Sequence, residues 1–163
     1  MLIKAILAVD GSGGVSKNGS MPWPHNSKDL DWFKKNTIKN IVIMGRITWI
    51  DPKIPTPLSD RINVLVTKQK PDKYPGADIY INGNLIESIK KIDSKYKNKI
   101  NWIIGGPNII NQLFPIIEEF YLTRIYGDYH CDTFIDLNNI EKEMKLNTRL
   151  NVDKTCHFEI WNK

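Results

Sequence analysis

The sequence predicts an α/β fold with a largely parallel sheet. Short apolar runs recur along the chain, and segments whose apolar residues have helical spacing lie between them. Continuous runs of Ile, Val and Leu are typical of strands covered on both faces, and alternating strands and helices are typical of parallel α/β domains. A length of 163 residues fits one domain with a sizeable core.

Eight segments are expected to form strands. Most of them are unbroken runs of Ile, Val and Leu, and all are short enough to be bounded by turns. They cover residues 2–9, 41–44, 62–66, 79–81, 101–104 and 119–126, with two more near residues 145–150 and 156–161.

Three helices are expected between these strands. Asn84 offers an N-cap with Glu87 three residues later, and apolar residues with helical spacing follow. Pro107 suits the first position of a second helix, and a third covers residues 28–36. The Gly- and Ser-rich segment 11–26 and the Pro-rich segment 51–60 are expected to be irregular surface loops.

The composition excludes several classes of protein. With 41% hydrophobic residues the chain is not expected to be disordered, and no apolar run reaches the roughly 18 residues of a membrane span. The first ten residues resemble a strand more than a secretory signal. Only two cysteines are present, which excludes a disulfide framework and favours a reducing, cytoplasmic location. The lysines behind the net charge of +5 are spread along the chain, which indicates solvated surface.

Three expected strands end in residues suited to binding phosphate. In open α/β sheets, ligands bind beyond the carboxyl ends of the strands. Glycine lets backbone N–H groups approach a phosphate, a helix N-terminus favours an anion, and cationic side chains add donors. The sequence therefore predicts a site for a molecule with several phosphates, such as a dinucleotide. The residues concerned are Gly45 and Arg46, Thr67 and Lys68, and Gly105 and Gly106.

A near match to the dinucleotide motif G-x-G-x-x-G occurs at residues 11–16. Its sixth position is Ser16 instead of Gly, and the following segment contains prolines that cannot open a helix. We therefore expect a compliant loop that closes over a site.

Two adjacent His/Cys pairs could suggest zinc. They are His130-Cys131 and Cys156-His157. Neighbouring residues on a strand point to opposite faces, so each pair offers only one ligand easily. No metal site is expected.

Asp29 is the acid with two interpretations. It lies in the first turn of the expected helix 28–36, close to Leu30, Trp32 and Phe33. It could be a helix N-terminal acid stabilised by the dipole, with Asn26 as cap. It could also be a carboxylate in an apolar cleft, where its pKa is raised and it can bind the amino and ring N–H groups of a heterocycle.

Several short motifs occur in a fixed order over essentially the whole chain. They are Ala8-Val9-Asp10, Met21-Pro22-Trp23, Asp29-Leu30-Asp31-Trp32-Phe33-Lys34, Val42-Ile43-Met44-Gly45-Arg46-Ile47-Thr48-Trp49, Ile103-Ile104-Gly105-Gly106, Tyr121-Leu122-Thr123, Cys131-Asp132-Thr133-Phe134 and Phe158-Glu159-Ile160. This series resembles the dihydrofolate reductase family. The resemblance implies one domain over residues 1–163, with a central, mostly parallel, mixed eight-stranded sheet, an antiparallel C-terminal strand and about four flanking helices.

The resemblance also implies a reaction and its catalytic residues. The reaction is the NADPH-dependent reduction of 7,8-dihydrofolate to 5,6,7,8-tetrahydrofolate, with hydride transfer to pterin C6 and protonation at N5. Asp29 would be the pterin-binding carboxylate, braced by Thr123. Trp23 would hold an ordered water, and Met21 would belong to the loop that closes over the nicotinamide.

Six residues are implied in substrate binding. The backbone carbonyls of Ile6 and Ile104 would line the pterin pocket. Arg61 would pair with the glutamate carboxylate, for which a guanidinium fork is well suited. The benzoyl group would pack on Leu30, Phe33 and Leu58.

The cofactor implied by the resemblance is NADPH. Arg46, Thr67 and Lys68 would meet the adenosine 2′-phosphate, and the Gly105-Gly106 peptide is expected to be cis. The nicotinamide and its ribose would be flanked by Ala8 and by the loop from Val15 to Ser20, which includes Gly19, and the pyrophosphate would be held by Gly45, Thr48, Gly105, Gly106, Pro107, Asn108 and Ile109. The chain departs from the commonest family pattern at Ser16, at Asn108 and at Ile110, where a Tyr often stands.

Two other functions compete with this interpretation. A riboflavin-pathway pyrimidine reductase shares the architecture, but it does not explain Asp29, Thr123 and Arg61 together. A non-catalytic basic module that binds nucleic acid would gather basic residues and exposed aromatics on one face, whereas the tryptophans here lie mostly in apolar patterns. We expect a monomer with no nucleic-acid or membrane partner.

Overall fold

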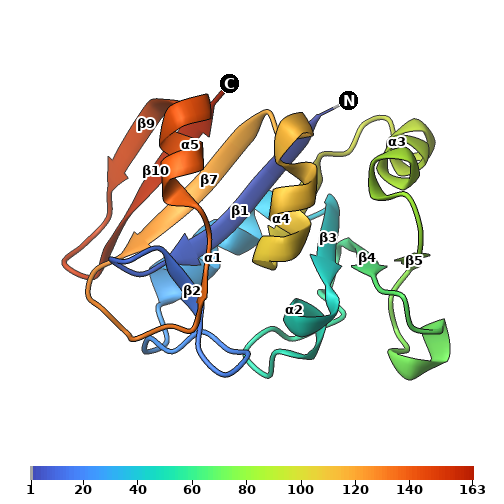
Figure 1. Ribbon diagram of the computed structural model, residues 1–163, viewed down its shortest axis with the longest axis horizontal. Coiled ribbons are helices and arrows are strands. Elements are labelled where there is room, and N and C mark those ends of the chain that lie inside the picture. Colours follow the sequence, from blue (N-terminus) through green and yellow to red (C-terminus); the bar gives the residue numbers. More distant parts are fainter. Residues whose placement is uncertain (1) are drawn as a thin grey trace.

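A mixed eight-stranded sheet crosses the middle of the molecule (Figure 1). The computed structural model describes residues 2–163. Within that range the sheet contains β1 (Ile3–Val9), β3 (Ile41–Gly45), β4 (Ile62–Val66), β5 (Ile79–Ile81), β6 (Asn101–Gly105), β7 (Glu119–Ile125), β9 (Lys145–Asn151) and β10 (Cys156–Asn162). All eight predicted strands are confirmed.

The strand order is β5-β4-β3-β6-β1-β7-β10-β9. Neighbouring strands from β5 to β7 pair in parallel. The C-terminal strand β10 runs antiparallel to both of its neighbours, β7 and β9, as predicted. The parallel part of the sheet therefore brings the carboxyl ends of β1, β3, β4 and β6 to one edge.

Five α-helices are described in residues 2–163, whereas the family resemblance implies about four. They are α1 (Ser27–Thr37), α2 (Arg46–Ile50), α3 (Leu85–Lys95), α4 (Pro107–Leu113) and α5 (Leu137–Glu143), and two 3₁₀ turns cover Pro71–Lys73 and Phe114–Ile116. The three predicted helices correspond to α1, α3 and α4. The short α2 and α5, of five and seven residues, were not predicted from the sequence. Five residues are too few for a clear helical period, and α5, although as long as α4, has apolar residues only at Leu137 and Ile140. None of the helices in this range has both the length and the apolar character that a bilayer crossing requires.

Helices cover both faces of the sheet. In Figure 1, α4 and α5 lie in front of the strands and α1 lies behind them. Side chains alternate along each strand, so Ala5 of β1 joins a core cluster with residues of α3, α4 and α5, whereas the next residue, Ile6, joins a cluster against which Trp32 and Phe33 of α1 pack. This double burial explains the continuous apolar runs.

The segment 11–26 is less irregular than predicted. Residues Gly14–Ser16 form strand β2, which pairs antiparallel with β8 (Thr133–Phe134). Its partner lies far along the chain, so no local pattern could predict it. The Asp10 carboxylate supports this unit, because it accepts from the backbone N–H groups of Gly14 at 2.9 Å and of Tyr129 at 3.0 Å.

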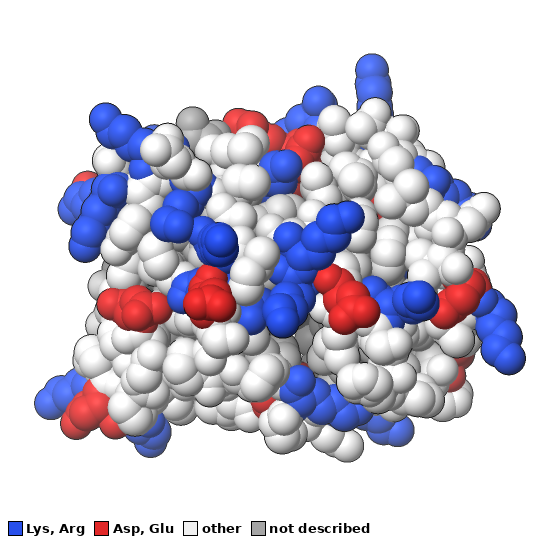
Figure 2. Space-filling view, turned by 180° about the vertical axis from the view of Figure 1, so that it is seen from behind, with Lys and Arg blue, Asp and Glu red and all other residues white. Residues whose placement is uncertain are grey.

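The charged side chains are distributed rather than segregated on the face opposite that of Figure 1. Figure 2 shows a group of Lys and Arg side chains near the centre of this face, bordered by Asp and Glu, with further cations toward its edges. The net charge of +5 therefore comes with acidic residues interleaved on this face.

Candidate active site

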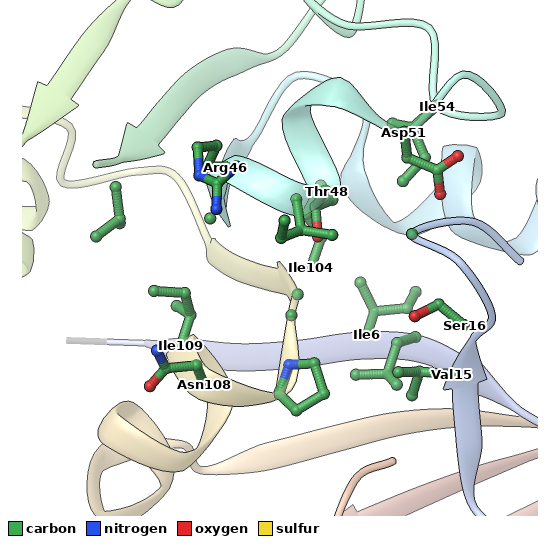
Figure 3. Close-up of a pocket in the computed structure, with 18 of the residues that line it drawn as sticks. Ile6, Val15, Ser16, Arg46, Thr48, Asp51, Ile54, Ile104, Asn108 and Ile109 are labelled. Carbon is green, nitrogen blue, oxygen red and sulfur yellow. The ribbon is translucent and has the colours of Figure 1, made fainter. Parts of the chain in front are cut away.

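A cleft of about 1310 Å³ opens at the carboxyl ends of β1, β3, β4 and β6. Figure 3 shows it between Ile6 of β1, Ile104 of β6, Thr48 of α2 and Ile109 of α4. This is the place at which ligands bind in open α/β sheets.

All but three of the predicted site residues line this cleft. The exceptions are Ser20, Trp23 and Thr123. Those in the lining are Ile6, Ala8, Val15, Gly19, Met21, Asp29, Leu30, Phe33, Gly45, Arg46, Thr48, Leu58, Arg61, Thr67, Lys68, Ile104, Gly105, Gly106, Pro107, Asn108 and Ile109.

Asp29 is a buried carboxylate in the wall of the cleft. It is 8% exposed, and burial raises the pKa of its side chain, while an interaction with the Thr123 hydroxyl acts in the opposite direction. Its backbone N–H donates to Asn26 Oδ1 at 3.1 Å, which caps α1. Both sequence-based interpretations therefore describe Asp29, since it is a capped helix-terminal acid and also a cleft carboxylate.

A smaller cavity of about 220 Å³ adjoins Asp29. Trp23 lines it together with Met21, Asn26 and Lys53. Trp23 itself is 4% exposed and its ring packs edge-on against Tyr129. Space therefore lies beside both Trp23 and Asp29.

The cations predicted to bind phosphate lie at the rim of the cleft. Arg46 begins α2 directly after β3, and Lys68 follows β4; both side chains are exposed. Among residues 2–163, neither of them forms an ion pair with a carboxylate. Thr67, which lies between the end of β4 and Lys68, is 8% exposed. Both cations are therefore available to an anionic ligand.

The two glycines after β6 bring backbone close to the cleft. The Gly105-Gly106 peptide is cis, as expected. Gly105 has φ +132°, and a Cβ there would lie 3.0 Å from Thr48 Oγ1. A Cβ on Gly106 would meet nothing within 4 Å, so open space lies beside its backbone. A ligand can therefore approach the backbone here, where a side chain would obstruct it.

Arg61 ends the apolar wall formed by α1 and the loop that follows α2. Its Nη1 donates to Thr37 Oγ1 at 3.1 Å and its Nε to the Ser59 carbonyl at 2.8 Å. The guanidinium carbon lies 6.0 Å from the centre of the Phe33 ring. Burial lowers the pKa of Arg61 and Asp60 opposes this shift, but a guanidinium stays charged in proteins.

The departures from the family pattern fall in different environments. Ser16 and Asn108 line the cleft (Figure 3), and Asn108 Oδ1 accepts from Gln112 Nε2 at 3.0 Å. Ile110 is 3% exposed and belongs to the core. The missing hydroxyl at Ile110 is therefore replaced by apolar packing.

Several cleft residues were not predicted from the sequence. Asp51, Lys53 and Ile54 line it, whereas Leu58 is the one residue of the expected surface loop 51–60 that the family resemblance assigns to the site. Asp51 is 6% exposed and caps the C-terminal end of α2. Its position two residues after the Gly45–Trp49 motif was the available signal.

The His/Cys pairs do not form a metal site. Within residues 2–163, no three His, Cys, Asp or Glu side chains are grouped so that they could hold a metal ion. The Cys131 thiol contacts Asp10 Oδ2 at 3.5 Å, Cys156 is fully buried, and His157 lies between the Tyr126 hydroxyl and the Glu159 carboxylate at 2.8 Å from each.

Fold and cleft together define a single-domain α/β protein with the ligand site of a nucleotide-dependent enzyme. A sequence model of one family, dihydrofolate reductase, matches residues 2–160. The chain belongs to the dihydrofolate reductase family.

Individual relatives agree with this assignment. The chain is 33% identical over 154 residues to the viral dihydrofolate reductase of Saimiriine herpesvirus 2 (strain 488), covering 85% of this chain and 72% of that protein. It is 31% identical over 161 residues to dihydrofolate reductase type 8 of Escherichia coli, covering 96% and 93%. A solved dihydrofolate reductase from Enterococcus faecalis, complexed with NADP(H) and RAB-propyl, has the same fold with a TM-score of 0.78, at 24% identity over 99% of this chain and 95% of that one.

Proposed function

We propose that this protein reduces 7,8-dihydrofolate to 5,6,7,8-tetrahydrofolate with NADPH, by hydride transfer to pterin C6 and protonation at N5. Membership in the dihydrofolate reductase family supports the reaction. The observation that carries the proposal is the buried carboxylate of Asp29 in the wall of the cleft.

Asp29 would bind and polarise the pterin. A carboxylate in an apolar wall can accept from the amino and ring N–H groups of a flat heterocycle, and a pKa raised by burial suits it to promoting protonation. Thr123 would orient the carboxyl group from β7. The cavity beside Trp23 would hold the water through which the proton reaches N5.

The remaining substrate would extend along the apolar wall. The benzoyl group would pack on Leu30, Phe33 and Leu58, which line the cleft. Arg61 at the end of this wall would pair with the glutamate carboxylate, because its Nη2 has no partner within the described residues and its other nitrogens are held by Ser59 and Thr37.

NADPH supplies the hydride when it is bound. Arg46, Thr67 and Lys68 would hold its 2′-phosphate at the rim. The open space at Gly106 and the first turn of α4 would accommodate its pyrophosphate. Ala8, Val15 and Gly19 would flank the nicotinamide end.

A cytoplasmic location and a monomeric state complete the proposal. Both cysteines, Cys131 and Cys156, are free thiols, which fits a reducing compartment. Sedimentation of the purified protein in the presence of NADPH tests the monomeric state directly.

The direct test is the loss of absorbance at 340 nm when protein, NADPH and dihydrofolate are mixed. We expect oxidation that depends on dihydrofolate and that is much slower with NADH. Asp31→Asn is a matched control for Asp29→Asn, because Asp31 is exposed on the same helix. Absence of dihydrofolate-dependent oxidation in the wild-type protein would overturn the proposal.

A further inference from the structure

The segment between β2 and α1 passes along the cleft with little regular structure of its own. Its turn is closed by Lys17 and Ser20, whose backbone groups exchange hydrogen bonds at 2.8 and 3.1 Å. The next residues place Met21 at the cleft and Trp23 at the smaller cavity beside Asp29. The position of this segment therefore decides where these two side chains lie.

A carboxylate from the opposite wall holds the turn. The Ser20 hydroxyl donates to Asp51 Oδ1 at 2.7 Å. The same oxygen accepts from the backbone N–H of Lys53 at 2.9 Å, which fixes the carboxylate at the end of α2. Figure 3 shows Asp51 in the part of the wall next to the segment after β2. A bond from a hydroxyl to a buried carboxylate is stronger than a neutral one.

A cation from the same loop holds the next part of the segment. Lys53 Nζ donates to the backbone carbonyl of Met21 and lies 3.4 Å from the carbonyl of Trp23. Asp51 and Lys53 are two residues apart in sequence, so one short loop forms hydrogen bonds with the segment at Ser20, Met21 and Trp23. All of these bonds are made to a hydroxyl or to backbone, so they control position without supplying a reacting group.

We infer that Asp51 and Lys53 are positioning residues that fasten residues 20–23 to the end of α2 and thereby hold Met21 at the cleft and Trp23 at the smaller cavity beside Asp29. The inference rests on the proposed function for its consequence, because that function places the nicotinamide end beside this segment and a water beside Trp23. Release of the segment would speed cofactor release and slow the hydride step, while substrate contacts on α1 remain unchanged.

The test separates the fastening from the reaction. Ser20→Ala removes the hydroxyl bond to Asp51, and Lys53→Met removes both contacts of the ammonium group. Asp51→Asn keeps an acceptor oxygen for Ser20 and serves as the conservative variant. Asp93→Ala is the control, because Asp93, like Asp51, accepts a hydrogen bond from a polar side chain, in its case the amide of Asn101 at 3.0 Å, but lies on α3 outside the cleft.

Hydrogen exchange in the ligand-free protein measures directly how firmly the turn at residues 17–20 is held. We expect the Lys17 and Ser20 amides to exchange roughly tenfold faster in Ser20→Ala and Lys53→Met. The Asn18 amide should change less, because it donates to Asp132 Oδ2 at 2.8 Å. Amides of β1 should stay unchanged in both variants, and Asp93→Ala should resemble the wild type. Asp51→Asn should fall between the wild type and Ser20→Ala, because it keeps an oxygen acceptor but loses the charge. Unchanged exchange at the Lys17 and Ser20 amides in both Ser20→Ala and Lys53→Met would overturn the inference.

Cofactor release reads the functional consequence. Stopped-flow displacement of NADPH should be several-fold faster in the two released variants, and single-turnover hydride transfer should be slower, with the KM for dihydrofolate little changed. The loop amides could exchange faster while NADPH release and hydride transfer stay unaltered. That result would show a purely structural role for Asp51 and Lys53 and would contradict the positioning role. Failure of the wild-type protein to reduce dihydrofolate would overturn the proposed function, and the exchange result would stand apart from it.

Discussion

Asp29 at the start of α1 lies against Thr123 of β7, and both side chains are buried, at 8% and 1% exposure. The Thr123 hydroxyl interacts with the carboxyl group. The two residues are far apart in the sequence. They meet only because α1 packs across the sheet on the side of Ile6 and Trp102. A protonatable group is thus held at a fixed place in the cleft wall.

Asp29→Asn should lower the turnover of dihydrofolate by two orders of magnitude or more at neutral pH, since general-acid assistance contributes roughly 10²–10⁴-fold. NADPH binding should remain nearly intact because the cofactor contacts lie elsewhere in the cleft. Steady-state kinetics and NADPH titration measure the two effects. Unchanged turnover, with the Asp31→Asn control also unchanged, would refute the role of Asp29.

Asp29 also makes a prediction about stability and pH. Its pKa is raised in the folded protein, mainly by burial, so the folded state binds this proton more tightly than the unfolded state does. Its contribution to stability is therefore greatest below the unfolded value of 3.8 and is lost as the pH rises through the folded pKa. Asn carries no charge, so Asp29→Asn should raise the Tm by a few degrees at pH 7. The gain should disappear near pH 4. Thermal unfolding at both pH values tests this, and a destabilised variant at pH 7 would contradict it.

Arg46→Ala should weaken the binding of NADPH far more than that of NADH. Loss of a charged hydrogen bond to phosphate corresponds to roughly tenfold or more in affinity, and NADH lacks the 2′-phosphate. Lys70→Ala is the control, because Lys70 is exposed nearby but lies outside the cleft. Fluorescence titration with both cofactors decides the matter, and an equal loss for both would argue against contact with the 2′-phosphate.

Arg61→Ala should raise the KM for dihydrofolate about tenfold or more, with a smaller effect on kcat, since a charged pair far from the reacting atoms is lost. Arg61→Lys should recover only part of the affinity, because an ammonium lacks the planar fork. Arg149→Ala, on the exposed edge strand β9, serves as the control. An unaltered KM in Arg61→Ala would remove this residue from the glutamate site.

The predicted and the unpredicted parts of the site differ in how local their signals are. The strand-end residues Arg46, Lys68 and Gly106 could be placed from the sequence, because parallel strands deliver their carboxyl ends to one edge. The contact between Ser20 and Asp51 could not, since both residues lie in segments interpreted as loops, and a hydrogen bond between two loops leaves no periodicity.

The sequence by itself determined the eight strands, the helices α1, α3 and α4 and the chemical groups at the strand ends, because periodicity and capping are properties of neighbouring residues. The tertiary structure alone decided which loop residues join the site. In the folded molecule Asp51 is buried, β2 pairs with β8, and burial raises the pKa of Asp29. Burial and pairing depend on segments brought from elsewhere in the chain, and therefore only the packed molecule contains them.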